Sequence, residues 1–471
     1  KIADKQATLK IDFLIVGGDM AGLACAVALR RVGHRVTVLE QDNSDTLNKR
    51  RESSGPCRIA PNLSKILYHW GLKNELRSIA VEADQVNLLL YETGELLGTH
   101  YWGEEVLRDT QGEFAFTQHA ALRHLLYELA LFSGAVVRLG AKVSTVDPVN
   151  QTVTLAESGE KLQADVIIGA DGPTGLTRRL LRPPVKEQLA AERMNMYSMT
   201  IPREAIMEDT DLAYLYSQKY TTMHNWFGHG RSALGFPVVR FFYGFGLFIY
   251  GPATDVEYDT QWDQHISPES LDSLLLTAEP KLKKLCRLSE EVICTGVWIQ
   301  PELEDWVHQS GRMLVIGEAA HPLPSGSLQS TAMTIEDAAV LAKLFSHLRQ
   351  RDQITTFLWA FQELRQPRCD SVTTKEAGII LCMTMEQSEV QQQRDDVTRA
   401  KRDMGKGILG GDGEDSPESP EWVEVKDVFG YSAEDEADNW WVQWGLLRER
   451  AKGTDVSYET LPIQVKTAVS H

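Results

Sequence analysis

The sequence predicts an α/β fold in which one parallel sheet is assembled from two separated parts of the chain. Three observations support this prediction. A strand, turn, helix and strand pattern opens the chain at residues 11–40, a β-rich section follows at about residues 194–298, and a strand, loop and helix pattern returns at residues 312–345. The 471 residues are enough for two or three domains with a large core.

The opening pattern is a βαβ unit. Short apolar runs at residues 13–16 and 36–39 are typical of buried strands, and residues 21–31 between them have helical apolar spacing. The first turn carries three glycines, and an acidic residue ends the second strand; these are Gly17, Gly18, Gly22 and Glu40. Such glycines let a pyrophosphate approach the helix N-terminus, and such a carboxylate binds a ribose hydroxyl. The unit is therefore of the dinucleotide-binding kind.

One residue departs from this fingerprint. Where the pattern G-x-G-x-x-G needs its second glycine, the chain has Asp19. Two unit charges about 4 Å apart repel by roughly 4 kcal/mol at an effective dielectric near 20, on the order of a thousandfold in affinity. Two interpretations stay open at this point: the nucleotide is repelled, or the turn relaxes and still binds it.

Composition excludes several classes of function. The formal charge of -18 argues against a nucleic-acid partner. The sequence has no run of eighteen apolar residues, so we expect no membrane-spanning helix. The six cysteines have no metal-binding spacing, which favours a reduced state and no metal site. With no signal-peptide pattern at the start, we expect a cytoplasmic protein that acts on a small molecule.

The remaining segments follow in order. The expected elements are a helix from residue 62, a hairpin at 85–97, a helix at 118–131, strands at 136–146, 152–155 and 164–172, a helix at 271–285 inside the β-rich section, and helices to about 404. An acidic loop follows at 410–421, and we expect Trp440, Trp441 and Trp444 to pack a terminal helix onto the body. This divides the chain into an α/β domain of residues 1–193 and 299–370, a β-rich domain of residues 194–298, and a helical region of residues 371–471.

Four motifs in this order carry a family resemblance: the glycine turn, the Pro61-Asn62 helix start, GADG at residues 169–172, and GEAAHP with IEDAAVL at residues 317–341. The chain resembles the FAD-dependent monooxygenases of the single-component aromatic-hydroxylase type, especially fungal salicylate-hydroxylase-like members. The resemblance implies an FAD-monooxygenase-like fold, a Rossmann-type domain split by a β-sheet substrate domain. It also implies FAD in an extended pose and the use of NAD(P)H and O2, often in secondary metabolism. The implied cofactor positions are Gly17, Gly18, Gly22, Glu40, Asp171 and Glu318.

Five departures from the family pattern all fall at cofactor contacts. They are Asp19 for the second glycine, His119 for an arginine, Glu318 for the aspartate that binds the ribityl chain, Ser330 for the glycine after Gln329, and Pro56-Cys57-Arg58 for a small glycine-containing stretch. The change at His119 alone removes a charge-assisted contact worth roughly 1.5–3 kcal/mol. We therefore expect FAD to bind weakly or not at all.

The leading hypothesis is a secondary-metabolite enzyme that has lost flavin and performs a non-redox cyclisation or isomerisation on a large apolar intermediate. The candidate catalytic residues are His119, Arg58, Glu318 and Gln329, and the expected substrate-covering residues are Trp226, Arg240, Phe241 and Tyr243. We expect structural roles for His224, His229 and His321. The alternative is an FAD- and NAD(P)H-dependent hydroxylase or epoxidase. A third class, a catalytically inactive binding partner, has no positive feature in the sequence.

Overall fold

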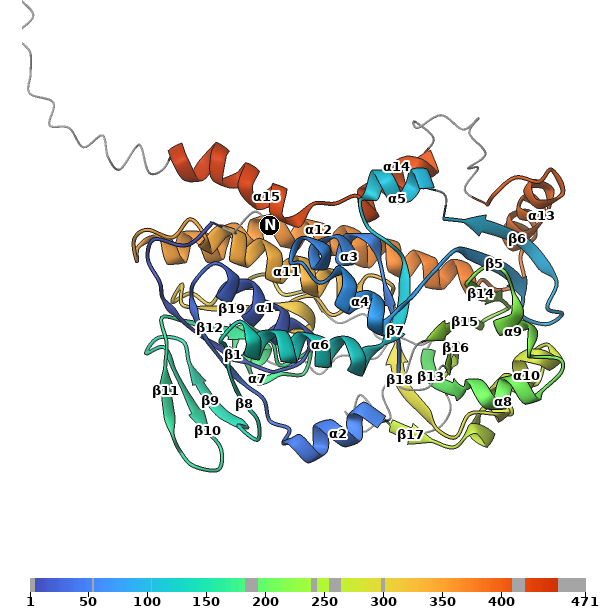
Figure 1. Ribbon diagram of the computed structural model, residues 1–471, viewed down its shortest axis with the longest axis horizontal. Coiled ribbons are helices and arrows are strands. Elements are labelled where there is room, and N and C mark those ends of the chain that lie inside the picture. Colours follow the sequence, from blue (N-terminus) through green and yellow to red (C-terminus); the bar gives the residue numbers. More distant parts are fainter. Residues whose placement is uncertain are drawn as a thin grey trace, which may run out of the picture.

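The computed structural model describes residues 5–52, 55–102, 104–182, 194–238, 244–253, 264–297, 301–408 and 420–447. Figure 1 shows an elongated molecule with a parallel sheet at one end and a larger, mostly antiparallel sheet at the other. Helix α12 (Gln353–Met383) runs along the long axis between the two ends. Its last residue reaches the large sheet region, where the Met383 carbonyl accepts a hydrogen bond from the Gly228 N–H.

The parallel sheet has five strands within the described residues. Their order is β19 (Met313–Val315), β12 (Val166–Gly169), β1 (Asp12–Val16), β2 (Arg35–Leu39) and β8 (Val136–Arg138). All neighbours pair in parallel, with Phe13 opposite Val36 on one side and Val166 on the other. The prediction that residues 13, 38, 167 and 315 share one sheet is confirmed. Apolar runs suit these strands because helices cover the sheet.

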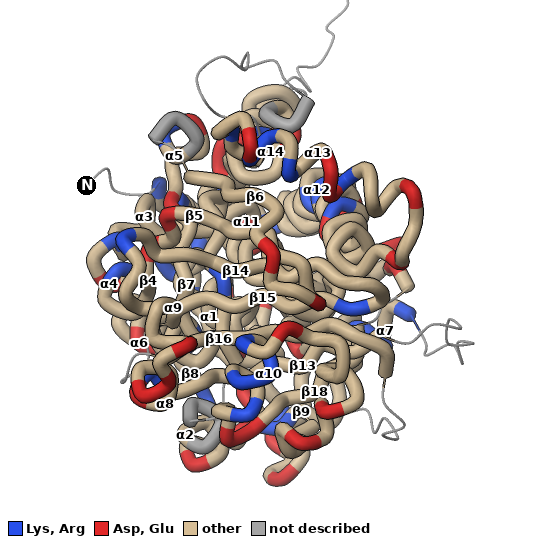
Figure 2. Tube along the Cα trace, turned by 90° about the vertical axis from the view of Figure 1, so that its right-hand side faces the viewer, with Lys and Arg blue, Asp and Glu red and all other residues tan. Residues whose placement is uncertain are grey.

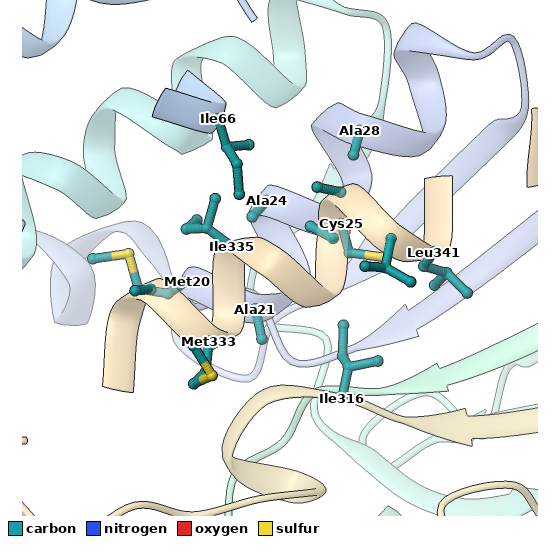
Figure 3. Packing of buried hydrophobic residues seen from close by; sticks show 14 of the residues in the cluster. Met20, Ala21, Ala24, Cys25, Ala28, Ile66, Ile316, Met333, Ile335 and Leu341 are labelled. Carbon is teal, nitrogen blue, oxygen red and sulfur yellow. The ribbon is translucent and has the colours of Figure 1, made fainter. Parts of the chain in front are cut away.

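Helix α1 (Met20–Arg31) packs against α11 (Ser330–Phe345), and this contact joins the first part of the chain to the last strand-loop-helix. Figure 3 shows the small side chains Ala21, Ala24, Cys25 and Ala28 of α1 in this packing, together with Ile335 of α11. Small residues at a helix contact let the two backbones approach closely. This packing keeps the βαβ turn, which precedes α1, next to the N-terminal end of α11.

The large sheet combines the middle section with one earlier hairpin. Its order is β17 (Gln264–Ile266), β18 (Val292–Val297), β13 (Met194–Pro202), β16 (Gly244–Pro252), β15 (Ser232–Val238), β14 (Thr222–Phe227), β5 (Gln85–Leu90) and β6 (Leu96–Tyr101). The predicted hairpin of residues 85–97 is confirmed as β5 and β6. The large sheet therefore extends beyond the predicted range of residues 194–298. It includes the earlier hairpin because β5 pairs in parallel with β14.

Two small sheets complete the strands of the described chain. One contains β9 (Val143–Asp147), β10 (Thr152–Leu155) and β11 (Lys161–Gln163), and the other contains β3 (Pro56–Ile59), β4 (Val81–Glu82) and β7 (Ala115–Gln118). In the second, β3 pairs with β7 so that Pro56 lies opposite Gln118. This pairing brings the segment around residue 58 next to the start of the helix that carries His119.

The other helices of the described residues are α2 (Ser44–Glu52), α3 (Pro61–His69), α4 (Lys73–Ile79), α5 (Glu104–Thr110), α6 (His119–Phe132), α7 (Leu176–Leu181), α8 (Arg203–Glu208), α9 (Tyr214–Ser217), α10 (Pro280–Arg287), α13 (Glu389–Asp403), α14 (Pro420–Phe429) and α15 (Ala433–Trp440), with short turns η1 (Pro268–Leu271), η2 (Gly317–Ala319) and η3 (Trp441–Gly445). None of them, nor α12, combines the length and apolar character that a membrane crossing requires. On the face shown in Figure 2, acidic and basic residues of the described chain are intermixed.

Three predicted elements differ from the structure. Residues 271–285 do not form one helix, because α10 begins at Pro280, whose fixed φ suits a first helical position. Residues 136–146 form two strands in different sheets, with Gly140 at φ +68 between them. Of the three C-terminal tryptophans, Trp440 and Trp441 are buried in the core and Trp444 is exposed. Most of the acidic loop, residues 410–419, lies outside the described residues.

Candidate active site

A cavity of about 1240 Å³ extends from the βαβ turn to the large sheet. It exceeds the roughly 300–1000 Å³ of ordinary small-molecule pockets, so it suits a long ligand or two ligands side by side. Its lining falls into three groups: the turn with Gly17, Asp19, Glu40 and Asp171, next to Arg123; the group His119, Glu318 and Ser330; and a sheet end with Arg58, Met196, Ser198, Phe248 and Ile293.

The turn keeps the backbone frame of a dinucleotide site. Gly17 has φ +106, and a Cβ there would lie 2.2 Å from the Ala170 carbonyl oxygen. A Cβ on Gly22 would lie 1.9 Å from the Gly17 oxygen, so neither glycine tolerates a side chain. The buried Glu40 carboxylate accepts hydrogen bonds from the N–H groups of Gly18 (2.9 Å) and Asp42 (2.8 Å). Burial raises the pKa of Glu40, and these bonds oppose the rise.

Asp19 places a carboxylate at the N-terminus of α1. Its backbone is in the ordinary extended region (φ −97, ψ −162), so the side chain causes no strain. Oδ1 accepts a hydrogen bond from the Met20 N–H at 2.9 Å. Arg123 Nε lies 3.4 Å from the same oxygen, and Arg123 Nη2 donates to the Gly18 carbonyl at 2.6 Å. The negative charge at the start of α1 is therefore supplied by the protein's own Asp19 carboxylate, and Arg123 supplies the positive charge that pairs with it.

Sequence reasoning did not identify Arg123. The available signal was its spacing, because it follows His119 by four residues and lies on the same face of α6. His119 begins α6, where its N–H donates to the Gly55 carbonyl at 3.1 Å, and its side chain lines the cavity as predicted.

Glu318 lies on η2, shortly after β19, and lines the cavity. Its Oε1 accepts a hydrogen bond from Ser330 Oγ at 3.3 Å. Burial raises the pKa of the Glu318 carboxyl, the charge of Asp19 raises it further, and His119 opposes the rise. A carboxyl whose raised pKa lets it hold its proton closer to neutral pH has the properties of a general acid.

At the sheet end, Arg58 extends from β3 over the ring of Phe248. Its Nη2 donates to the Gly326 carbonyl, and its guanidinium carbon lies 5.8 Å from the Phe248 ring centroid. Ser198 lies opposite Phe248 on the adjacent strands β13 and β16. Arg58, His119 and Glu318 therefore line the same cavity.

Several predicted residues lie elsewhere. Gln329, the residue before α11, does not line the cavity. Its side chain is buried, and its Oε1 accepts a hydrogen bond from Asn62 Nδ2 at 2.8 Å. Trp226 does not cover the cavity, because it packs in a separate hydrophobic cluster with residues such as Phe245 and Leu247, and its Nε1 donates to Glu279 Oε1 at 2.6 Å. Asp171 lines the cavity, but its carboxylate also accepts from the Thr177 N–H at 3.0 Å at the start of α7. The other three predicted substrate residues, Arg240, Phe241 and Tyr243, lie outside the described residues.

His321 belongs to a buried ion-pair network rather than to the cavity. Its Nε2 lies 2.6 Å from Asp337 Oδ2, and Arg365 donates through Nε to Asp337 Oδ1 and through Nη1 to Glu336 Oε2, each at 2.8 Å. Cys369 is close enough to His321 and Asp337 for the three to share a metal ion. The guanidinium of Arg365 already supplies the positive charge at this place, so the geometry is that of an ion-pair network. This agrees with the structural role expected for His321.

The comparisons with known proteins agree with this fold. The family model described as FAD binding domain matches residues 10–238. The FAD-dependent monooxygenase OpS4 of Beauveria bassiana (strain ARSEF 2860) is 26% identical over 390 residues, covering 82% of this chain and 88% of the relative. The FAD-dependent monooxygenase ntnJ of Nectria sp is 25% identical over 401 residues, covering 84% and 90%. Asperlicin C monooxygenase of Petromyces alliaceus is 23% identical over 372 residues, covering 76% and 77%.

Solved structures share the overall architecture. CtdE in complex with FAD and its substrate has a TM-score of 0.74 at 19% identity, covering 93% of this chain and all (100%) of that one. A salicylate hydroxylase substrate complex has a TM-score of 0.69 at 16% identity, covering 91% and 97%. At these identities the likeness concerns the fold.

Proposed function

The chain belongs to the FAD-dependent monooxygenase family, and from this premise we propose that it is a natural-product biosynthetic enzyme that uses the family's cavity for a non-redox cyclisation or isomerisation. The proposed substrate is a large, mostly apolar intermediate, because the cavity of about 1240 Å³ is large and Met196, Phe248 and Ile293 give it apolar surface next to the large sheet. The non-redox character rests on how the residues at the cofactor contacts compare with the needs of FAD.

The single observation that carries the proposal is the carboxylate of Asp19 at the start of α1. A dinucleotide pyrophosphate binds there through free helix N–H groups and the positive end of the helix dipole. In this chain Asp19 Oδ1 accepts a hydrogen bond from the Met20 N–H and forms an ion pair with Arg123. One helix N–H group and the Arg123 guanidinium therefore already have an anionic partner within the protein. The residues at this place do not fit the pyrophosphate of FAD.

Glu318 supplies the proposed chemistry. In its protonated form it donates a proton to an oxygen or an alkene carbon of the substrate. The resulting carboxylate then accepts a proton from another carbon of the same molecule, so that the bonds rearrange with no net gain or loss of electrons or atoms. Ser330 holds the Glu318 carboxyl by its 3.3 Å hydrogen bond. His119, which lines the same cavity, favours the anionic form of Glu318 through its charge.

The alternative function is an FAD- and NAD(P)H-dependent hydroxylase or epoxidase. Two observations favour it: the frame of Gly17, Gly22 and Glu40 is intact, and the compared relatives carry the name FAD-dependent monooxygenase. Arg123 also offsets part of the charge of Asp19.

Blocking the enzyme in its native producer distinguishes these functions. The variant Glu318→Gln should accumulate the substrate of the enzyme, which is compared by mass spectrometry with the metabolite that the unmodified strain makes from it. A non-redox enzyme predicts two compounds of identical mass. A difference of one oxygen atom between them would contradict the proposal and support the hydroxylase or epoxidase.

A further inference from the structure

The wall under the large sheet contains two polar side chains with unused hydrogen-bonding capacity. Arg58 has five N–H donors in a planar arrangement. One of its nitrogens donates to the Gly326 carbonyl, and no carboxylate within the described ranges forms an ion pair with the guanidinium. The charge of Arg58 acts on the buried carboxyl of Glu376 on α12, where it opposes the rise in pKa that burial causes; the Glu376 carboxylate accepts the Leu328 N–H at 2.8 Å. Arg58 therefore brings a positive charge to the cavity with donors to spare.

Ser198 is the second of these side chains. It is 4% exposed and lines the cavity, and its Oγ finds no hydrogen-bond partner among the described residues. A buried hydroxyl without a partner costs roughly 1–3 kcal/mol, so such a group in a cavity wall points to a ligand that satisfies it.

Arg58 and Ser198 flank the same aromatic ring. Ser198 lies directly opposite Phe248 on neighbouring antiparallel strands, so the two side chains share one face of the sheet. The Arg58 guanidinium lies over that ring at 5.8 Å. A Cβ on Gly55, the residue before β3, would lie 2.7 Å from Ser198 Oγ, which places the hydroxyl beside the strand that carries Arg58. Met196 and Ile293 add apolar surface to the same wall.

We propose that Arg58 and Ser198 form a subsite for a delocalised oxygen anion, such as a carboxylate, on an otherwise apolar and planar substrate. Guanidinium donors match a carboxylate in a bidentate arrangement, and the serine hydroxyl donates to one of its oxygens. The apolar part of the substrate then lies along Phe248, Met196 and Ile293. The inference deepens the proposed function, on which it rests, by naming the chemical class of the substrate.

The test uses naphthoate as a probe and naphthamide as its neutral counterpart, with the full chain and fluorescence titration. The unmodified protein should bind naphthoate at least about tenfold more tightly than naphthamide, as expected for one charge-assisted pair. Arg58→Met should remove this preference, and Ser198→Ala should reduce naphthoate affinity by a factor of a few. Arg108→Met is the matched control, because Arg108 is 73% exposed and does not line the cavity.

Circular dichroism and a thermal melt of each variant establish that the fold is intact. If Arg58→Met does not fold, Arg58→Lys serves instead, since it keeps the charge and loses the bidentate geometry; its preference for naphthoate should fall. Equal binding of the two probes by the unmodified protein, or an unchanged preference in the folded Arg58 variant, would overturn the subsite. Tight binding of FAD together with an Arg58-dependent preference would contradict the non-redox function and leave the subsite standing.

Discussion

The guanidinium of Arg123 lies 3.4 Å from the carboxylate of Asp19, across the start of the first helix of the βαβ unit. The same guanidinium donates to the Gly18 carbonyl and lies 3.9 Å from Glu40. An ion pair internal to the protein thus stands where a dinucleotide site of this fold holds a phosphate. The pair is partly exposed, so its contribution to stability is small, and its consequence is for binding.

Removing the charge of Asp19 should raise the affinity for FAD. Asp19→Asn keeps an acceptor for the Met20 N–H and frees Arg123 to meet a phosphate. We expect a gain on the order of tenfold from the lost repulsion, measured by quenching of flavin fluorescence in a titration. Asp396→Asn is the control, since Asp396 is 76% exposed and lies outside the cavity. An unchanged affinity in Asp19→Asn would show that this carboxylate does not govern flavin binding.

The pH dependence of turnover should follow Glu318. Its pKa is raised by burial and by Asp19, and the acid is active when protonated. Activity is therefore present below the raised pKa and lost as the pH rises through it. Asp19→Asn removes one of the two causes of the rise, so the falling limb of the kcat/KM profile should move to lower pH. The measurement uses the intermediate that accumulates in Glu318→Gln; a limb that does not move in Asp19→Asn counts against Glu318 as the acid.

The buried network around Arg365 should dominate local stability. Arg365→Met removes the guanidinium that pairs with both Glu336 and Asp337, and leaves Glu336 with the weaker ion pair to Arg368 at 3.4 Å. Breaking these buried pairs should cost about 3–5 kcal/mol of unfolding free energy. Arg351→Met is the matched control, because Arg351 is 65% exposed in its pair with Asp165 and should cost less than about 1 kcal/mol. Urea denaturation measures both, and similar losses in the two variants would contradict the structural role of the network.

Two glycine substitutions should act in opposite directions. Gly22→Ala places a Cβ 1.9 Å from the Gly17 carbonyl oxygen, so the turn must open and the protein should lose stability. Gly378→Ala, inside α12, meets nothing within 4 Å and should stabilise the helix by roughly 0.5–1 kcal/mol. Thermal denaturation of the two variants is the measurement. A neutral Gly22→Ala would mean that the turn packs less tightly than the structure indicates.

Most of the fold could be predicted from the sequence because its strands are short apolar runs that end at glycine-containing motifs. The strands around Phe13, Val38, Ile167 and Val315 lie in one parallel sheet as expected. What the sequence could not reveal were pairings between distant segments. The hairpin of β5 and β6 joins the large sheet through β14, and no local pattern in residues 85–101 specifies that partner.

The candidate site could be predicted less completely. His119, Arg58 and Glu318 line the cavity, because each follows a motif whose position in the fold is fixed. Trp226 was misplaced because alternate residues of a strand face opposite sides, and the aromatic pattern of β14 does not say which side faces the cavity. Arg123 was missed because an arginine on an amphipathic helix has no feature that separates it from a surface residue.

The flavin content of the purified protein separates a non-redox enzyme from a flavin-dependent oxygenase. The protein is purified after expression with excess riboflavin, its absorbance spectrum is recorded, and FAD is then titrated into it with NAD(P)H oxidation followed in air. We expect a colourless preparation, weak binding of added FAD and no flavin-dependent oxidation of NAD(P)H. The triple variant Asp19→Gly, His119→Arg and Glu318→Asp should bind FAD measurably more tightly. A yellow preparation with stoichiometric FAD and substrate-stimulated NAD(P)H oxidation would contradict the loss of flavin and support the hydroxylase or epoxidase.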